Sequence, residues 1–277
     1  MTESNHGAEH LRRDLAPISA SAWAEIDEQA KQTLQTFLAA RKLVDFSGPH
    51  GFEHASVALG RTAPVSATIR DGVETRLRTV QPLTELRVPF TLSRREIDDI
   101  DRGAKDAELA PVVDAARTIA LAADQAVFHG YAPGHIEGIM EATEKSRIEL
   151  DEAFDAYPKR VVEAMHRLRS AGIGGPYALA LGPRCYDGLH TTFSPAGYPV
   201  IRVVEELLEG PLVWAPAISG AVVLSLRGGD FELTVGQDLS IGYLGHDDHE
   251  VRLYLQETFT FRCLAPEAAI PLRYRSG

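Results

Sequence analysis

Residues 236–261 include five consecutive polar side chains of the types that bind metal ions: His246, Asp247, Asp248, His249 and Glu250. Such imidazole and carboxylate groups can hold a catalytic divalent cation if one coordination position stays open. A metal site needs three or four ligands that converge at about 2.0 to 2.2 Å on one point, which neighbours in one turn rarely achieve. His246 and His249 could form a pair, but no motif elsewhere in the sequence supplies a third histidine or carboxylate to complete the site. We predict no metal site here.

The flanking residues instead indicate a turn between two strands. From Val251 to Cys263 the odd positions are apolar and the even positions mostly polar, which is typical of a half-buried strand. Only Glu257 breaks this alternation. The preceding VGQDLSIGYLG supplies a partner strand, so the polar run lies where a hairpin must reverse. Asp and His tolerate the backbone angles of turns.

Other catalytic patterns are missing or weak. The sequence has no G-x-S-x-G elbow, no G-x-x-x-x-G-K-[ST] loop and no H-E-x-x-H helix. The glycines of GIGGP (172–176) follow a predicted helix and precede a strand, the reverse of a dinucleotide-binding fingerprint. Cys185 and His190 place a thiol and an imidazole five residues apart, but nothing nearby predicts a thiolate. We therefore predict no catalytic residue and no cofactor.

Composition and charge restrict the class of protein. The chain has 277 residues, 44% of them hydrophobic and 24% charged, which predicts one elaborated globular domain or two intertwined ones. A net charge of -11 disfavours nucleic acid and membrane surfaces as partners, because both are negative. Cys185 and Cys263 lack a C-x-x-C spacing, so we expect free thiols. Neither a signal peptide nor a spanning segment is recognisable, so we expect a cytoplasmic protein.

Helical periodicity occurs in three long segments. From Ser21, apolar residues recur every three or four positions for about twenty residues, ending before Gly48. A second helix begins near Pro111, which suits a first turn, and its many alanines permit close packing up to Gly130. The third spans about residues 152–171.

Strand periodicity occurs between and after these helices. In residues 49–92 polar and apolar residues alternate, and Asp71-Gly72 predicts a hairpin tip. This hairpin has few large apolar residues near its tip, so we expect an arm that leans on a neighbouring chain. Buried strands are predicted at residues 177–182 and 221–226, with a short helix between them around 203–208. Because helices and strands mix without a βαβ rhythm, the predicted class is α+β.

Several long motifs in a fixed order resemble the encapsulins, the shell proteins of bacterial nanocompartments. The matching stretches are LRRDLAPIS (11–19), SAWAEIDEQA (21–30), RKLVDFSGPHGFE (41–53), LTELRVPFTLSRREIDDIDRG (83–103), GGDFELTVGQDLSIGY (228–243) and RLYLQETFTFRCLAPEA (252–268). The resemblance implies the major-capsid-protein fold of tailed bacteriophages and a self-assembling icosahedral shell around a cargo enzyme. That cargo would be a haem peroxidase of the dye-decolourising type or a ferritin-like iron-storage protein.

The same resemblance implies a division of the chain. The expected parts are an N-terminal arm (1–19), the N-terminal helix of a peripheral domain (20–48), an extended loop (49–88), the peripheral domain with a spine helix (89–138), an axial domain (139–227) and C-terminal strands of the peripheral domain (228–277).

Two sites are also implied. A groove on the inner wall would bind a C-terminal targeting peptide of the cargo through Leu34, Leu38, Arg41, Asp45, Asp238, Leu239 and Ile241. An apolar groove with flanking charges suits an amphipathic tail, although Leu34, Leu38, Leu239 and Ile241 could equally be ordinary core. A five-fold pore would be lined by Ser194, Pro195, Ala196, Gly197 and Tyr198. Some relatives bind flavin beside an aromatic residue, but Arg95 stands at that position, so no flavin is predicted.

Three alternatives stay open. A prophage major capsid protein would share the fold but enclose DNA. A bacteriocin or protease-like activity would use Cys185 and His190. A metal enzyme would use His246, Asp247 and His249.

Overall fold

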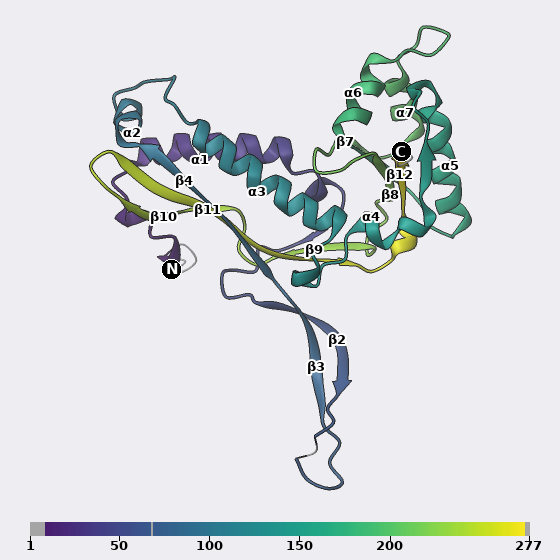
Figure 1. The fold of residues 1–277 in the computed structure, drawn as a ribbon, viewed down its shortest axis with the longest axis horizontal. Helices are drawn as coiled ribbons and strands as arrows, with labels where there is room; N and C mark the ends of the chain where they lie inside the picture. The colour runs from purple at the N-terminus through teal and green to yellow at the C-terminus, as the bar shows by residue number, and fades with distance from the viewer. Residues whose placement is uncertain (1–8, 68, 275–277) are drawn as a thin grey trace, which may run out of the picture.

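The computed structural model describes residues 9–67 and 69–274, which form two mixed helix-and-sheet units and a projecting arm (Figure 1). Each unit is built around a five-stranded sheet, and the arm is a separate two-stranded ribbon. The predicted α+β class is therefore confirmed. Within residues 9–67 and 69–274, no helix is both long and apolar enough to cross a lipid bilayer.

The first sheet is organised around β11 (Glu250–Cys263). Its first part pairs antiparallel with β10 (Ser240–His246) and with β4 (Thr84–Ser93), and its last part pairs with β9 (Phe231–Val235). The short β1 (Asp45–Ser47) runs parallel to β9 and extends the sheet. The predicted hairpin around the polar run is confirmed, since β10 and β11 are its two strands.

Two long helices pack side by side on this sheet (Figure 1). Helix α1 (Ala20–Phe37) begins at Ser19, whose side chain accepts a hydrogen bond from the backbone N–H of Ala22, and α3 (Ala110–His129) begins with a proline in its first turn. The buried face of α3 is rich in alanine, which lets α1 and the strands approach closely. The short α2 (Arg94–Asp101) joins β4 to this pair.

The second sheet has the order β5-β12-β8-β6-β7. Its strands are β5 (Ile148–Leu150), β12 (Ala269–Tyr274), β8 (Ala221–Ser225), β6 (Tyr177–Leu181) and β7 (Leu212–Trp214). Its helices are α4 (Ile139–Ala142), α5 (Tyr157–Ser170), α6 (Pro183–Thr191) and α7 (Val200–Leu207). Every residue of β6 and β8 is buried, as their continuous apolar sequences predict.

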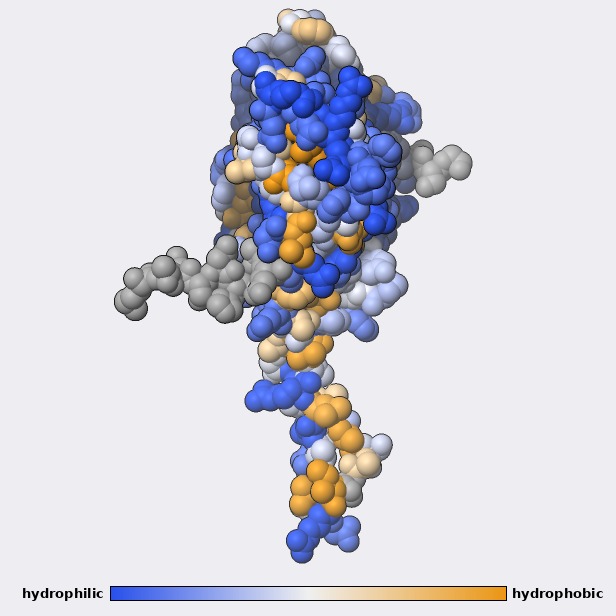
Figure 2. Space-filling model, turned by 90° about the vertical axis from the view of Figure 1, so that its left-hand side faces the viewer, coloured by the Kyte–Doolittle hydropathy of each residue, from blue (hydrophilic) through white to orange (hydrophobic). Residues whose placement is uncertain are grey.

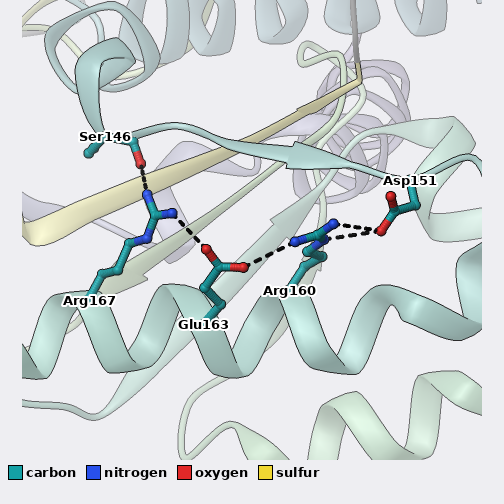
Figure 3. A network of polar contacts seen from close by, with 5 residues as sticks. All are labelled: Ser146, Asp151, Arg160, Glu163 and Arg167. Atoms are coloured by element: carbon teal, nitrogen blue, oxygen red, sulfur yellow. Dashed lines mark hydrogen bonds and ion pairs between the residues drawn. The ribbon is translucent and has the colours of Figure 1, made fainter.

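A chain of ion pairs fixes α5 to the segment before it (Figure 3). Arg160 pairs with Asp151 and Glu163, at nitrogen-to-oxygen distances of 2.9 and 3.2 Å. Glu163 in turn pairs with Arg167, which also donates to the backbone oxygen of Ser146. All four charged side chains are partly exposed, so this chain orients the helix more than it stabilises the fold.

Two boundaries differ from the expected division. Strand β12 pairs with β8 and β5, so residues 269–274 lie in the second sheet and not with the other C-terminal strands. The ladder of the arm ends at Pro82, and β4 already pairs with β11 from Thr84, short of the expected boundary at residue 88. In both cases long-range pairing decides the boundary, which local sequence does not reveal. The rest of the division stays a prediction.

The arm consists of β2 (Ser56–Pro64) and β3 (Arg76–Pro82), and it projects far from both sheets (Figure 1). The strands end at Pro64 and resume at Arg76, so Asp71-Gly72 lies in the loop between them, as the predicted tip. Hydrophobic residues occur along its length (Figure 2), and Ile69, Leu77 and Val80 are more than half exposed. A two-stranded ribbon of this kind cannot bury such side chains by itself.

A close backbone approach joins the first unit to the second. A Cβ atom added at Gly138 would lie 2.2 Å from the backbone nitrogen of Gly130, at the end of α3. We predict that Gly138→Ala lowers the free energy of unfolding by about 1 to 3 kcal/mol, because rigid backbone atoms must move. Gly174→Ala is the matched control, since its Cβ would meet nothing within 4 Å. Equal denaturation midpoints for the two variants would contradict this account.

Candidate functional site

A cavity of about 710 Å³ opens between α1 and the β10 side of the first sheet. Six of the seven residues predicted for peptide binding border it: Leu34, Leu38, Arg41, Asp238, Leu239 and Ile241. They come from two segments separated by about two hundred residues, so the fold brings both halves of the predicted site to one place. We call this cavity the groove.

Asp45, the seventh predicted residue, is not among the described residues that border the groove. It borders a smaller cavity of about 190 Å³ beside β1. One of its carboxylate oxygens accepts a hydrogen bond from the backbone N–H of Gly229 at 2.6 Å. Asp45 therefore holds the turn before β9.

The groove has further walls that the sequence interpretation missed. Asp27, Ala30 and Lys31 border it from α1. They lie three, four or seven positions before Leu34 on the same helix face, so helical periodicity could have identified them. Leu11 and Arg13 also border it, from the segment before α1. No periodic signal marks these two residues, because their position depends on how the chain folds back.

A buried carboxylate holds the turn that carries Arg41. Asp124 of α3 accepts hydrogen bonds from the backbone N–H groups of Ala39 and Ala40, at 2.7 and 3.1 Å. These groups lie where α1 gives way to the short 3-10 turn η3 (Ala40–Lys42). The carboxylate thus satisfies donors that would otherwise be buried without partners. It also fixes the direction in which Arg41 leaves this turn.

Arg41 connects the groove with the protein interior. Its guanidinium pairs with Asp238 at 2.7 Å and with Glu257 of β11. The side chain of Glu257 is 2% exposed, and its second carboxylate oxygen, Oε2, has no hydrogen-bond partner within residues 9–67 and 69–274. Glu257 lies on β11 between two hydrophobic clusters, one containing Leu255 and the other Phe259. Glu257, which interrupts the alternating pattern of β11, is therefore the buried carboxylate that pairs with Arg41.

Burial dominates the electrostatics of these carboxylates. It raises the pKa of Glu257, while the charge and hydrogen bond of Arg41 oppose that shift. Burial also raises the pKa of Asp124 to about 7, against the lowering effect of its two backbone hydrogen bonds. For Arg41, burial would lower the pKa, but Glu257 and Asp238 raise it. The guanidinium is therefore charged at every pH of interest.

The structure does not assemble the alternative catalytic sites. The Nδ1 atom of His246 is hydrogen-bonded to the hydroxyl of Tyr243, while Asp247 accepts from the backbone N–H groups of His249 and Glu250. This is the geometry of a tight turn. In the described part of the chain, no three His, Cys, Asp or Glu side chains are grouped to hold a metal ion.

The thiol and imidazole pair is also separated by its contacts. Cys185 is buried, and its sulfur lies 3.3 Å from the hydroxyl of Tyr274. The Nδ1 atom of His190 lies 2.9 Å from the backbone oxygen of Tyr186 on the same helix. Each group therefore has a structural contact of its own. Cys263, like Cys185, is a free thiol, as predicted.

The residues predicted for the pore form a tight turn between α6 and α7, at the top of Figure 1. The backbone N–H of Ser194 donates to the oxygen of Tyr198 at 2.8 Å. The hydroxyl of Tyr198 donates to Glu206 at 3.0 Å, so an acidic side chain lies close to this loop.

Comparison of this sequence with known proteins identifies its family. A family model described as "Encapsulating protein for peroxidase" matches residues 8–260. The type 1 encapsulin shell protein of Rhodospirillum rubrum is 56% identical over 268 residues, covering 95% of this chain and 96% of that protein. The chain belongs to the encapsulin shell-protein family. It is a shell protein of a nanocompartment, and the resemblance noted in its sequence is confirmed.

Solved structures show the fold of this encapsulin independently of sequence. The virus-like particle from Pyrococcus furiosus has a TM-score of 0.62 at 17% identity and covers 90% of this chain and 98% of its own. A structure of Mycobacterium phage Ogopogo has a TM-score of 0.56 at 18% identity and covers 85% and 91%. The predicted major-capsid-protein fold is thereby confirmed.

The pair of Arg41 and Glu257 should be important for stability of the encapsulin subunit. We predict that Arg41→Ala lowers the free energy of unfolding by about 3 kcal/mol, because it leaves a buried carboxylate without its cation. Arg41→Met combined with Glu257→Met should recover most of this loss, since the carboxylate that needed Arg41 is gone as well. Chemical denaturation of the purified subunits measures both. A double variant as unstable as Arg41→Ala would contradict the assignment.

Asp124 should make stability depend on pH. Its folded pKa of about 7 exceeds the ordinary value of 3.8, so the folded state binds the proton more tightly. The contribution of Asp124 to the free energy of unfolding is therefore complete below about pH 4 and is lost as the pH rises to about 7. In the wild type, this group should lower the free energy of unfolding by on the order of 4 kcal/mol between pH 4 and pH 7. We predict that Asp124→Asn removes this dependence on pH. Denaturation curves from pH 4 to 8 test this; an unchanged slope would contradict it.

Proposed function

We propose that this encapsulin encloses a cargo enzyme inside an icosahedral shell by binding the cargo's C-terminal peptide in the groove. The observation that carries the proposal is the groove itself. Its volume of about 710 Å³ lies in the range of pockets that enclose most of a small ligand, roughly 300 to 1,000 Å³. A few side chains of an extended or helical tail would fill it.

The chemistry of the groove supports an amphipathic peptide. Leu34 lies in the last turn of α1 and Leu38 directly follows that helix, while Leu239 and Ile241 border the groove from the start of β10. Such pairs of apolar side chains can anchor alternate positions of a bound peptide. Arg41 and Asp238 at the edge are already paired with each other, so they can orient polar groups of the peptide without carrying a free charge.

The family description supports a peroxidase as the cargo, because it names encapsulation of that enzyme class. We propose a haem peroxidase first and a ferritin-like iron-storage protein as the other outcome. The shell itself is proposed to carry no enzymatic activity. Its compartment is proposed to lie in the cytoplasm, where newly made cargo meets subunits before the shell closes.

The loop of residues 194–198 is proposed to line a pore of this shell. Its exposed position at the end of the second unit supports this role, as do the exposed side chains of Phe193 and Tyr198. Glu206, hydrogen-bonded to Tyr198, would supply negative charge beside the opening.

We predict that Leu34→Arg abolishes cargo loading and leaves assembly intact. Leu34 is only partly buried, so the arginine can be accommodated, but its charge and length would occupy the groove. The measurement is the amount of cargo in purified shells after co-expression with the cargo protein that copurifies with native shells.

Gln32→Arg is the matched control for this variant. Gln32 is exposed on the same helix but does not border the groove, so loading should stay at the wild-type level. Normal loading of Leu34→Arg shells would show that cargo binds elsewhere.

A further inference from the structure

The segment before α1 crosses one part of the groove. It consists of two short 3-10 turns, η1 (Glu9–Leu11) and η2 (Arg13–Leu15), and both contact β10. In Figure 1 it lies beside β10 and leads from there to the start of α1. We call residues 9–15 the strap.

One end of the strap is attached to the sheet side. The Nε2 atom of His10 lies 2.8 Å from the side-chain oxygen of Gln237, just before β10. The ring of His10 stacks on Phe52, with ring centres 3.9 Å apart. Gln237 is itself held by the side-chain amide of Gln256 and by a backbone hydrogen bond to the Thr258 hydroxyl. This end therefore rests on the rigid centre of the first sheet.

The other end is attached to α1 through Arg13. Its guanidinium donates two hydrogen bonds to the carboxylate of Asp27, at 2.7 and 3.0 Å. It also lies over the ring of Trp23, 3.8 Å from the ring centre. A two-pronged arginine–carboxylate contact is directional, so it fixes position as well as charge. Because Arg13 sits only two residues after Leu11, this clamp also fixes Leu11.

Leu11 is 6% exposed and borders the groove together with Arg13 and Asp27. The strap is thus a third wall, joined to both of the others. Without the clamp, Leu11 would be held less firmly, and the carboxylate of Asp27 would border the groove without its arginine partner.

We propose that the strap determines how tightly the groove holds its peptide, with Arg13 as the positioning residue that keeps this wall closed. The inference rests on the proposed function and adds a residue to it. A bound peptide should leave only after the strap loosens, so losing the clamp should mainly accelerate dissociation.

The test uses complete shells, opened in denaturant and reassembled with a fluorescein-labelled peptide. The peptide is the last fifteen residues of the cargo protein that copurifies with native shells. Bound peptide per subunit, measured over a range of peptide concentrations, gives an apparent Kd and a maximum loading. We expect Arg13→Ala to raise the apparent Kd about tenfold at unchanged maximum loading. A purely structural defect would instead lower the maximum loading.

Three further variants isolate the clamp. Arg13→Lys keeps the positive charge but cannot donate the two parallel hydrogen bonds of a guanidinium, so it should recover only part of the affinity. Asp27→Asn should weaken binding as Arg13→Ala does, and combining the two should add little, because they remove one contact. Arg12→Ala is the control: Arg12 is exposed in the same strap and does not border the groove, so its Kd should stay within twofold of wild type.

The outcomes separate this inference from the proposed function. If Leu34→Arg abolishes peptide binding while Arg13→Ala and Asp27→Asn bind as wild type does, the strap inference is wrong and the function stands. Equal weakening by Arg12→Ala and Arg13→Ala would also overturn it. If Leu34→Arg itself binds the peptide normally, the groove is not the cargo site, and the proposed function fails.

Discussion

One buried contact, between Arg41 and Glu257, links the interior of this encapsulin subunit to its groove. A carboxylate without exposure to water is costly unless a cation is held against it. The subunit supplies that cation from η3, and Asp124 fixes η3 by accepting two backbone hydrogen bonds. Helix α1, spine helix α3 and strand β11 therefore meet around a small set of charges. The groove opens at this meeting point.

This arrangement gives the proposed cargo site a fixed surface. Two hydrophobic clusters, one in the first unit and one that continues into the second, both extend to Leu34 and Leu239. These groove walls therefore belong to the packed core and do not move independently. The strap is the exception, because it reaches the core through single side chains such as Leu11 and Arg13. Under the proposed function, a peptide would enter past the strap and be retained between it and the rest of the groove. The arm, with its exposed apolar side chains, projects away from this site, and its contact with a neighbouring subunit stays a prediction.

Much of this could be predicted from the sequence, because the signals were local. The periodicity of α1 and α3, the Asp71-Gly72 tip and the turn after His246 all depend on neighbouring residues. Six groove residues followed from the family resemblance, but the place of Asp45 at a different cavity did not. The transfer of residues 269–274 to the second sheet, the strap, and the pairing of Arg41 with Glu257 are contacts between distant parts of the chain. Glu257 did stand out as a break in an alternating strand, yet its partner could not be named.

The most direct test of the central claim is an electron cryomicroscopy map of shells purified with their native cargo. The account predicts extra density for a short peptide in the groove, bordered by Leu34, Leu239 and the strap, on the inner surface of a closed particle. Cargo-filled particles with an empty groove, or with peptide density on another face of the subunit, would contradict it.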